Sequence, residues 1–367
     1  MAKYKLGDIC EIVSGSTPKT SVENYWDGDI KWITPAEIND NTYIINDSVR
    51  KITELGVKKT GLSPFPEGTI ILSSRAPIGK VAIAGCEMYC NQGFKNLICS
   101  DKIYNKYLYW FLKGNTAFLN SLGRGATFKE ISKSIVSEIE INVPNIEHQK
   151  EAVGALEKVS GVISLRKQEL SDLDDLIKAR FVEMFGDITI NDKNWKYEPL
   201  GELCTIVRGG SPRPIEQFLG GDVPWIKIGD ATDGDSVYLR STKEYIIQEG
   251  VKKSRLVKEG SLIFANCGVS LGFARIITFD GCIHDGWLAM EDIDERLDKV
   301  FLLQALNQMT EHFRAIAPAG TQPNLNTAIM KAYKQVIPPI ELQREFISFA
   351  KQVDKSKVVD IDKKDKL

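Results

Sequence analysis

The side chains that most often perform catalysis are few and scattered in this sequence. Its three histidines, His148, His284 and His312, have the spacing of neither a metal site nor a nucleophile–base–acid triad. His284 and Asp285 stand near Cys282 and have the chemistry of a general base, but an isolated pair of this kind in a loop is more often structural. We therefore expect no catalytic residue.

The seven cysteines are odd in number and scattered, unlike a disulfide framework. Cys86 and Cys90 stand four positions apart, but no second pair of ligands lies nearby to complete a zinc site. We expect buried free thiols and no metal. The first residues contain no apolar signal stretch, and no run of about 18 apolar residues occurs, so the expected location is cytoplasmic.

Motifs for nucleotide and cofactor chemistry are missing as well. The sequence contains no Gly-x-x-x-x-Gly-Lys-[Ser/Thr] phosphate loop, no Asn-Pro-Pro-Tyr methylation motif, no glycine-rich cofactor loop and no Pro-Asp dipeptide of the common nuclease signature. We expect no cofactor. The net charge of −2 and the pI near 6.1 also argue against a stand-alone DNA binder, which is usually basic.

The main feature of the sequence is a long internal repeat. Residues 6–18, LGDICEIVSGSTP, recur as LGELCTIVRGGSP at 200–212, which is 200 − 6 = 194 positions later. The offset persists within one or two positions for GDIKWI at 28–33 and GDVPWI at 221–226, and for VPNIEHQ at 143–149 and IPPIELQ at 337–343. A period this long indicates a duplicated domain rather than a solenoid. The duplication either presents two similar surfaces to a ligand with two similar sites, or only enlarges a scaffold.

Each repeat is predicted to be a mixed α/β unit of about 140 to 150 residues. Short β-branched or apolar runs bounded by Gly and Pro predict strands at 9–13, 69–72, 81–83 and 273–278. Helices follow at about 104–122 and 298–316, and each repeat closes with a strand, at 138–143 or 333–337. We expect domains at 1–144 and 187–338, joined by a spacer helix at 145–186, with a short helix and charged tail at 339–367.

The segment between the repeats is predicted to be one long helix. It has no proline from 146 to 185, and an apolar side chain recurs every seven residues, as is typical of a coiled-coil seam. The seam residues, which we expect to bind a partner helix, are Leu156, Ile163, Leu170, Ile177 and Met184. A second helix at 341–353, with apolar residues at four-three-four spacing, is the natural antiparallel partner.

In this order, and present twice, these motifs resemble the DNA specificity subunits of type I restriction–modification systems. The resemblance rests on the Leu-Gly-x-x-Cys opening, the Gly-Asp-x-x-Trp-Ile element, the SRAPIGK run at 74–80, the GTQPNLN run at 320–326 and the Pro-x-x-Glu-x-Gln start of each long helix. It covers nearly the whole chain.

The resemblance implies two similar globular target-recognition domains and long antiparallel coiled-coil helices. Each domain would read one half of an asymmetric bipartite site in double-stranded DNA. Methyltransferase subunits that methylate adenine from S-adenosylmethionine would dock on the helices, and restriction subunits with translocase and nuclease activity would join the complex. Such partners would supply phosphate contacts that this nearly neutral chain lacks.

One departure from the family pattern concerns the second helix. The 194-residue offset predicts that it extends to about position 379, but the sequence ends at Leu367 with a charge run that is typical of a solvated tail. The alternatives are therefore a truncated specificity subunit that recruits only one methyltransferase subunit, or a non-catalytic interaction scaffold. A stand-alone methyltransferase or nuclease would need motifs that are absent.

Residues that reach base edges or phosphates should be basic or amide side chains in the turns of each repeat. The candidates in the first repeat are Lys19, Arg75, Lys80, Asn91, Gln92, Arg124 and Lys129, and those in the second are Arg213, Lys227, Asn266, Arg275, Gln322 and Asn324. Among them, Arg124 between two glycines and Arg213 between two prolines are favoured, because restricted loops hold a side chain outward. Trp32 and Trp225, which occupy equivalent positions, are predicted to be core residues.

Overall fold

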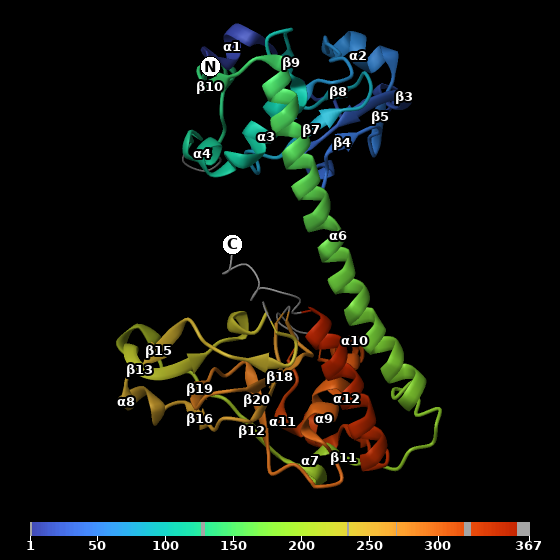
Figure 1. Cartoon of the computed structure of the whole chain (residues 1–367), viewed down its shortest axis with the longest axis vertical. Coiled ribbons are helices and arrows are strands. Elements are labelled where there is room, and N and C mark those ends of the chain that lie inside the picture. The colour runs from blue at the N-terminus through green and yellow to red at the C-terminus, as the bar shows by residue number, and fades with distance from the viewer. Residues whose placement is uncertain (1, 126–128, 233–234, 269, 319–323, 358–367) are drawn as a thin grey trace. The chain divides into compact units, whose positions relative to one another are not determined.

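The computed structural model describes residues 2–125, 129–232, 235–268, 270–318 and 324–357. The chain divides into two compact units, Met1–Arg166 and Lys167–Leu367. Figure 1 colours the first unit from blue to green and the second from green to red. The division falls inside one long helix, α6 (Ile146–Phe185). The sequence predicts a helix over this segment.

In the first unit, the described strands form three sheets. Their orders are β2 (Cys10–Val13), β9 (Asn96–Cys99), β6 (Ile70–Leu72), β7 (Val81–Ala84) and β4 (Ile44–Ile45); then β5 (Arg50–Ile52), β3 (Trp26–Ile33) and β8 (Tyr89–Cys90); and last β1 (Ala2–Lys5) with β10 (Glu140–Val143). The helices are α1 (Leu6–Ile9), η1 (Glu23–Tyr25), η2 (Pro35–Glu37), α2 (Glu54–Thr60), α3 (Asn105–Gly114), α4 (Thr116–Ser121) and α5 (Lys133–Ser137).

The second unit repeats this arrangement. Its described sheets have the orders β12 (Thr205–Arg208), β20 (Trp287–Glu291), β17 (Leu262–Ala265), β18 (Ala274–Ile277) and β14 (Tyr238–Leu239); then β15 (Glu244–Ile246), β13 (Leu219–Ile226), β19 (Gly281–Ile283) and β16 (Arg255–Val257); and last β11 (Tyr197–Pro199) with β21 (Lys334–Val336). Its helices are α7 (Leu200–Leu203), η3 (Ile215–Gln217), η4 (Ile228–Asp230), α8 (Gln248–Val251), α9 (Lys299–Gln308), α10 (Thr310–Ile316), α11 (Thr327–Ala332) and α12 (Ile340–Lys357).

The two helices predicted at 104–122 and 298–316 are each broken in the structure, which corrects the prediction. Asn115 separates α3 from α4, and its side-chain amide donates to the Phe111 carbonyl oxygen at 2.7 Å. Thr310 likewise donates to the Asn307 carbonyl oxygen at 2.9 Å, where α10 follows α9. These side chains satisfy carbonyl groups that would otherwise bond to the next helical turn, so the helix ends there.

Apolar residues of the repeated motifs form the cores. Trp32 and Trp225 are 2% and 4% exposed, which confirms the prediction that both are core residues. The described helices include none that is both long and apolar enough to cross a membrane.

The second half of α6 packs inside the second unit. Phe181 contacts Phe346 of α12 edge-to-face, with ring centroids 5.3 Å apart, and Lys357 Nζ lies 2.6 Å from Asp174 Oδ1. Because the higher-numbered end of α12 meets the lower-numbered residues of α6, the two helices run antiparallel, as predicted. In Figure 1, α12 also lies alongside α9 of the same core.

One fully buried glutamine anchors the start of each long helix. The Gln149 side chain accepts from the Tyr104 backbone N–H at 2.7 Å and donates to the carbonyl oxygens of Lys102 and Pro144 at 3.1 and 2.8 Å. Gln343 repeats this pattern: it accepts from the Asp298 N–H and donates to the carbonyls of Arg296 and Pro338. The glutamine of the Pro-x-x-Glu-x-Gln motif therefore ties the helix to the loop before α3 or α9.

Replacing Gln149 by leucine should destabilise the first unit by about 2–4 kcal/mol. The apolar side chain has nearly the same volume, but one backbone N–H and two carbonyl groups in a part-buried position lose their hydrogen-bond partner. Calorimetric unfolding would measure the loss. The same change at the exposed Gln168 of α6 should alter stability by no more than about 0.5 kcal/mol, and equal effects at both positions would contradict the anchoring role.

Candidate nucleic-acid interface

A glycine brings the opening loop of each repeat onto a neighbouring strand. A Cβ on Gly15 would lie 1.9 Å from the Cys90 carbonyl oxygen, and one on Gly209 would lie 2.1 Å from the His284 carbonyl oxygen. No other residue fits this close approach. The glycine of the repeated motif therefore places the Thr17 and Ser211 loops beside the segments that follow β8 and β19.

In the first unit, these contacts assemble what we call the first loop cluster, residues 15–19, 74–75, 91–93 and 124–130 without 126–128. The buried Trp32 indole donates to the Ser16 carbonyl oxygen at 3.0 Å, and the Thr17 hydroxyl donates to Gln92 Oε1 at 2.5 Å. The Ser74 N–H donates to the Gly93 carbonyl oxygen at 2.7 Å. Segments far apart in the sequence thus form one surface, and the buried Trp32 indole holds its opening loop by a hydrogen bond.

A charged triad supports one side of the first loop cluster. Lys95 is only 8% exposed, and its Nζ lies 3.2 Å from Ser74 Oγ and 3.3 Å from Glu130 Oε1. The other carboxylate oxygen, Glu130 Oε2, lies 3.3 Å from Arg75 Nη1. Glu130 also exchanges two backbone hydrogen bonds with Arg124, at 3.0 and 2.9 Å. Glu130 therefore connects a buried cation to both arginines of this loop cluster.

The second unit has an equivalent second loop cluster, residues 209–213, 266–267, 284–286 and 324. The Ser211 hydroxyl donates to Asp285 Oδ1 at 2.7 Å, as Thr17 does to Gln92. The Asn266 N–H donates to the Gly286 carbonyl oxygen at 3.0 Å. The buried Asn266 amide donates to the Leu325 carbonyl oxygen at 3.2 Å, and Asn324 forms a β-bridge with Cys267. The backbone contacts repeat, while the side chains differ.

Asp285 is the electrostatic centre of the second loop cluster. Its Oδ1 lies 3.0 Å from His284 Nε2, its Oδ2 lies 3.4 Å from Arg213 Nη2, and its carbonyl oxygen accepts from Arg208 Nε at 3.2 Å. Burial alone opposes ionisation of this carboxyl, but the Ser211 hydrogen bond, His284 and the two arginines together hold its pKa below the ordinary value. The carboxylate is therefore ionised at neutral pH.

His284 is held in one tautomer. Burial lowers the pKa of its imidazole against the opposing effect of Asp285, which favours the neutral ring. The Gly286 N–H donates to Nδ1 at 2.9 Å, so the ring proton resides on Nε2, which lies 3.0 Å from Asp285 Oδ1. The protonated Nε2 of the neutral His284 ring therefore lies next to the Asp285 carboxylate.

The structure gathers some of the candidate residues and separates others. The first loop cluster contains Lys19, Arg75, Asn91, Gln92, Arg124 and Lys129, and the second contains Arg213, Asn266 and Asn324. Lys80 lies beside the first cluster, where its Nζ donates to the Pro35 carbonyl oxygen at 2.9 Å. Lys227 is ion-paired with Glu244, whereas Arg275 lies over the Phe273 ring in a hollow next to Asp174 of α6. Gln322 is outside the described residues.

The residues proposed for the partner-binding seam have two environments. Leu156 and Ile163 are 43% and 51% exposed, and Leu170 is half-buried. Ile177 and Met184 are buried in the core of the second unit. Of the five seam residues, those before residue 177 are therefore the ones that remain at least partly exposed.

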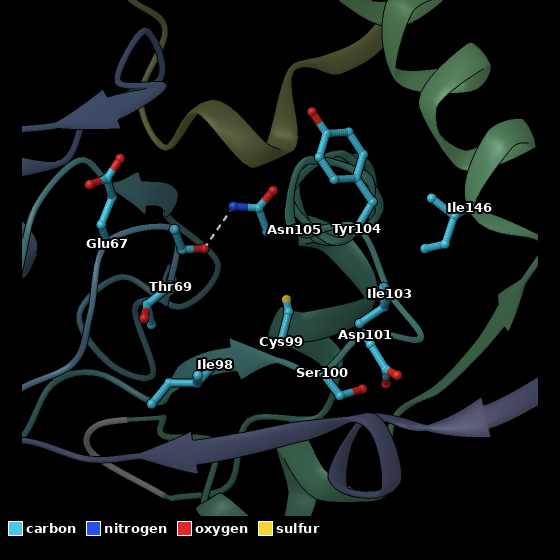
Figure 2. A pocket seen from close by; sticks show the side chains of 11 residues that line it. Glu67, Thr69, Ile98, Cys99, Ser100, Asp101, Ile103, Tyr104, Asn105 and Ile146 are labelled. Atoms are coloured by element: carbon cyan, nitrogen blue, oxygen red, sulfur yellow. Dashed lines mark hydrogen bonds between the residues drawn. The ribbon is translucent and has the colours of Figure 1, made fainter.

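A hollow of about 340 Å³ beside the start of α6 differs from the two loop clusters in the side chains that line it (Figure 2). Figure 2 shows Glu67, Asp101 and Asn105 around it, with the Asn105 amide donating to the Gly68 carbonyl oxygen at 2.9 Å. None of the residues that line this hollow is basic, so it does not suit a phosphate backbone.

The seven cysteines are all free, as expected, but Cys86, Cys99 and Cys267 are half-buried rather than buried. Burial raises the pKa of the Cys90 thiol to about 12, and the Cys86 thiol donates to the Asn46 carbonyl oxygen at 3.3 Å. In the part of the chain that the structure describes, no three histidine, cysteine or acidic side chains are grouped as metal ligands.

The sequence did not point to four of the hydroxyl and charged side chains that organise both loop clusters, Thr17, Lys95, Glu130 and Ser211, and it indicated only a structural role for His284 and Asp285. Acidic residues are not expected at a surface that meets phosphates, and Lys95 directly precedes β9 without a motif of its own. A signal was present, because Asn91-Gln92-Gly93 and His284-Asp285-Gly286 stand 193 positions apart, close to the offset of the repeat. Alignment of these tripeptides would have paired Gln92 with Asp285.

Comparison with known protein families shows to which family this chain with two equivalent loop clusters belongs. The family model described as "Type I restriction modification DNA specificity domain" matches residues 1–174 and again residues 192–366. The chain belongs to this family. The resemblance inferred from the repeated motifs is confirmed, and so is the mixed α/β fold with two similar domains.

Two relatives of this chain come from Methanocaldococcus jannaschii. The type I restriction enzyme MjaIX specificity subunit is 31% identical over 370 residues, which cover 94% of this chain and 84% of that protein. The MjaVIII specificity subunit is 21% identical over 387 residues, which cover 99% and 87%.

Solved structures agree on the fold of the specificity family. A chain from a structure concerned with complex assembly and conformational transition of the type I R–M system matches with a TM-score of 0.59 at 17% identity, over 97% of this chain and 90% of that one. The type I S subunit of M. genitalium matches with a TM-score of 0.53 at 17% identity, with the same coverage.

Replacing Glu130 by glutamine should destabilise the first unit by about 1–3 kcal/mol, because the buried Lys95 ammonium loses its counter-charge while the hydrogen-bonding shape is kept. Calorimetric unfolding would measure the change. The same substitution at the exposed Glu140, which pairs with Lys3, serves as the control and should have little effect. Adding Lys95→Met to Glu130→Gln should recover much of the loss, and strictly additive effects would contradict the coupling.

Proposed function

We propose that this chain is the sequence-reading subunit of a type I restriction–modification complex and does no chemistry itself. Two target-recognition domains, at 1–144 and 187–338, each read one half of an asymmetric bipartite site in double-stranded DNA through their loop clusters. Bound methyltransferase subunits then methylate adenine, and restriction subunits join through the complex.

The observation that carries this proposal is the equivalence of the two loop clusters. The same backbone contacts build both, yet Thr17, Gln92 and Arg75 in the first become Ser211, Asp285 and Cys267 in the second. A repeated scaffold with different side chains at its loops is what two unlike half-sites require, because base edges are distinguished by their donor and acceptor patterns.

The chemistry of the loop clusters suits DNA. Arg124 and Arg213 are exposed on loops, and guanidinium groups bind either phosphates or the two acceptors of guanine. Lys19, Lys129 and Gln92 add further exposed donors. The net charge of −2 implies that partner subunits supply part of the phosphate contact.

The first half of α6 supports docking of a methyltransferase subunit. In the described structure, Leu156, Val159, Val162, Ile163 and Leu165 are between 43% and 73% exposed on this helix. A contiguous apolar helix surface in a water-soluble complex is typical of a protein interface. Its position next to the first domain would place the catalytic partner near the DNA that the domain reads.

The alternatives make different predictions. A scaffold without DNA affinity is less well supported, because both halves match a DNA specificity family. The expectation of a truncated second helix depends on residues 358–367, which lie outside the described residues. Titration of the chain with its methyltransferase subunit distinguishes a subunit that recruits one partner from one that recruits two.

We expect Arg124→Ala and Arg213→Ala each to weaken specific DNA binding by about 1–3 kcal/mol, because each removes an exposed guanidinium from one loop cluster. The two variants should relax opposite half-sites. Binding of the complex with its methyltransferase subunit to variant duplexes, measured at two or more salt concentrations, would test this.

Each arginine variant is the control for the other, since a general loss of folding or charge would affect both half-sites alike. Wild-type binding that lacks both sequence preference and salt dependence would overturn the proposed function.

We expect Leu156→Ser with Ile163→Ser to weaken binding of the methyltransferase subunit at least tenfold, because the variant removes apolar area from the exposed part of α6. Sedimentation or calorimetric titration would measure the affinity. The matched control is Lys158→Ser with Lys167→Ser, at exposed polar positions of the same helix. Full affinity in the apolar variant would show that the partner docks elsewhere.

A further inference from the structure

Positions 92 and 285 are equivalent in the two units, but their charges differ. A hydroxyl of the opening loop donates to each side chain, from Thr17 to Gln92 at 2.5 Å and from Ser211 to Asp285 at 2.7 Å. The glycine that follows each accepts a backbone hydrogen bond, at 2.7 Å in the first unit and 3.0 Å in the second. In the first unit the uncharged amide of Gln92 is enough to hold the opening loop. The negative charge of Asp285 is therefore not required to hold the equivalent loop in the second unit.

The two carboxylate oxygens of Asp285 have separate roles. Oδ1 accepts from the Ser211 hydroxyl at 2.7 Å and lies 3.0 Å from His284 Nε2. Oδ2 faces Arg213, with 3.4 Å between Oδ2 and Nη2. The Asp285 side chain is 31% exposed and that of Arg213 is 81% exposed, so the acid lies under the loop while the guanidinium projects into solvent.

The loop around Arg213 restricts where that guanidinium can go. Pro212 and Pro214 flank the arginine and fix their own φ angles, and Pro212 is buried. A guanidinium has five N–H donors in a planar fork, and contact with one carboxylate oxygen leaves most of them free. Two parallel donors of this kind match O6 and N7 of guanine in the major groove.

Resting on the proposed function, we propose that Asp285 is a positioning residue that orients Arg213 to read a guanine in the half-site of the second domain. The first domain has Lys19 and Gln92 in these places, and the lysine ammonium is a point charge that lacks the paired donors of arginine. The first domain therefore reads its own half-site without this arginine–carboxylate unit.

The test is the methylation pattern produced by the assembled complex. The chain and its methyltransferase subunit are produced together in a host without adenine methylation, and methylated adenines are mapped over the genome by long-read sequencing. In both Asp285→Asn and Arg213→Lys, one and the same G·C pair of one half-site should become degenerate, with at least a tenfold loss of discrimination, while the other half-site is unchanged. The double variant should be no worse than either single one, because the two residues act as a unit.

The matched control is Asp280→Asn, which removes another carboxylate of the second unit, ion-paired with Lys258 and half-exposed. It should leave the methylated sequence unchanged. If Asp285→Asn fails to fold, Arg213→Lys still decides, because the proposal requires it to relax a G·C pair.

Three results would overturn the assignment while leaving the proposed function intact. These are an unchanged methylated sequence in the variants, relaxation of an A·T pair, or relaxation of different base pairs by the two variants. The last result would mean that Asp285 contacts a base itself, since a carboxylate accepts from cytosine N4. A wild-type complex that methylates no defined sequence would instead overturn the proposed function.

Discussion

In each half of the chain, one fully buried glutamine joins the long helix to the domain from which it emerges. Gln149 and Gln343 each accept from one backbone N–H and donate to two carbonyl oxygens, on both sides of the junction. Only an amide can accept and donate in this way without carrying a charge into the core. The loop before α3 or α9, the final strand and the helix are thereby held together, and the exposed apolar residues of α6 start from a fixed position on the first unit.

Duplication has kept this scaffold and changed the groups that it carries. The glycines that allow the loops to approach, Gly15 and Gly209, make the same close contacts, as do the backbone hydrogen bonds of Ser74 and Asn266. The charges differ between the units. The first unit buries Lys95 against Glu130. In the second unit the position equivalent to Lys95 is Leu288, and the carboxylate is that of Asp285. A rigid backbone with exchangeable polar groups is a physical basis for reading unlike half-sites.

The long helix combines two uses of one heptad pattern. Its later seam residues, Ile177 and Met184, are buried against the second unit's own core, which includes α12. Its earlier seam residues, Leu156 and Ile163, remain exposed in the structure described. A single periodic sequence therefore supplies both a buried face, which stabilises the second unit, and an exposed apolar face in the first unit.

The duplication, the mixed α/β class, the helix at 146–185 and the core positions of Trp32 and Trp225 can all be predicted from the amino-acid sequence. These follow from periodicity, repeated motifs and residue size, which are local or self-comparing properties. The sequence did not determine the break at Asn115, where a side chain competes with the backbone for a carbonyl group. Which loops meet is visible only in the folded chain, where Thr17 contacts Gln92 and Arg75 contacts Glu130, each pair more than 50 residues apart in the sequence. Such contacts depend on how the sheets pack, and no spacing along the chain encodes them directly.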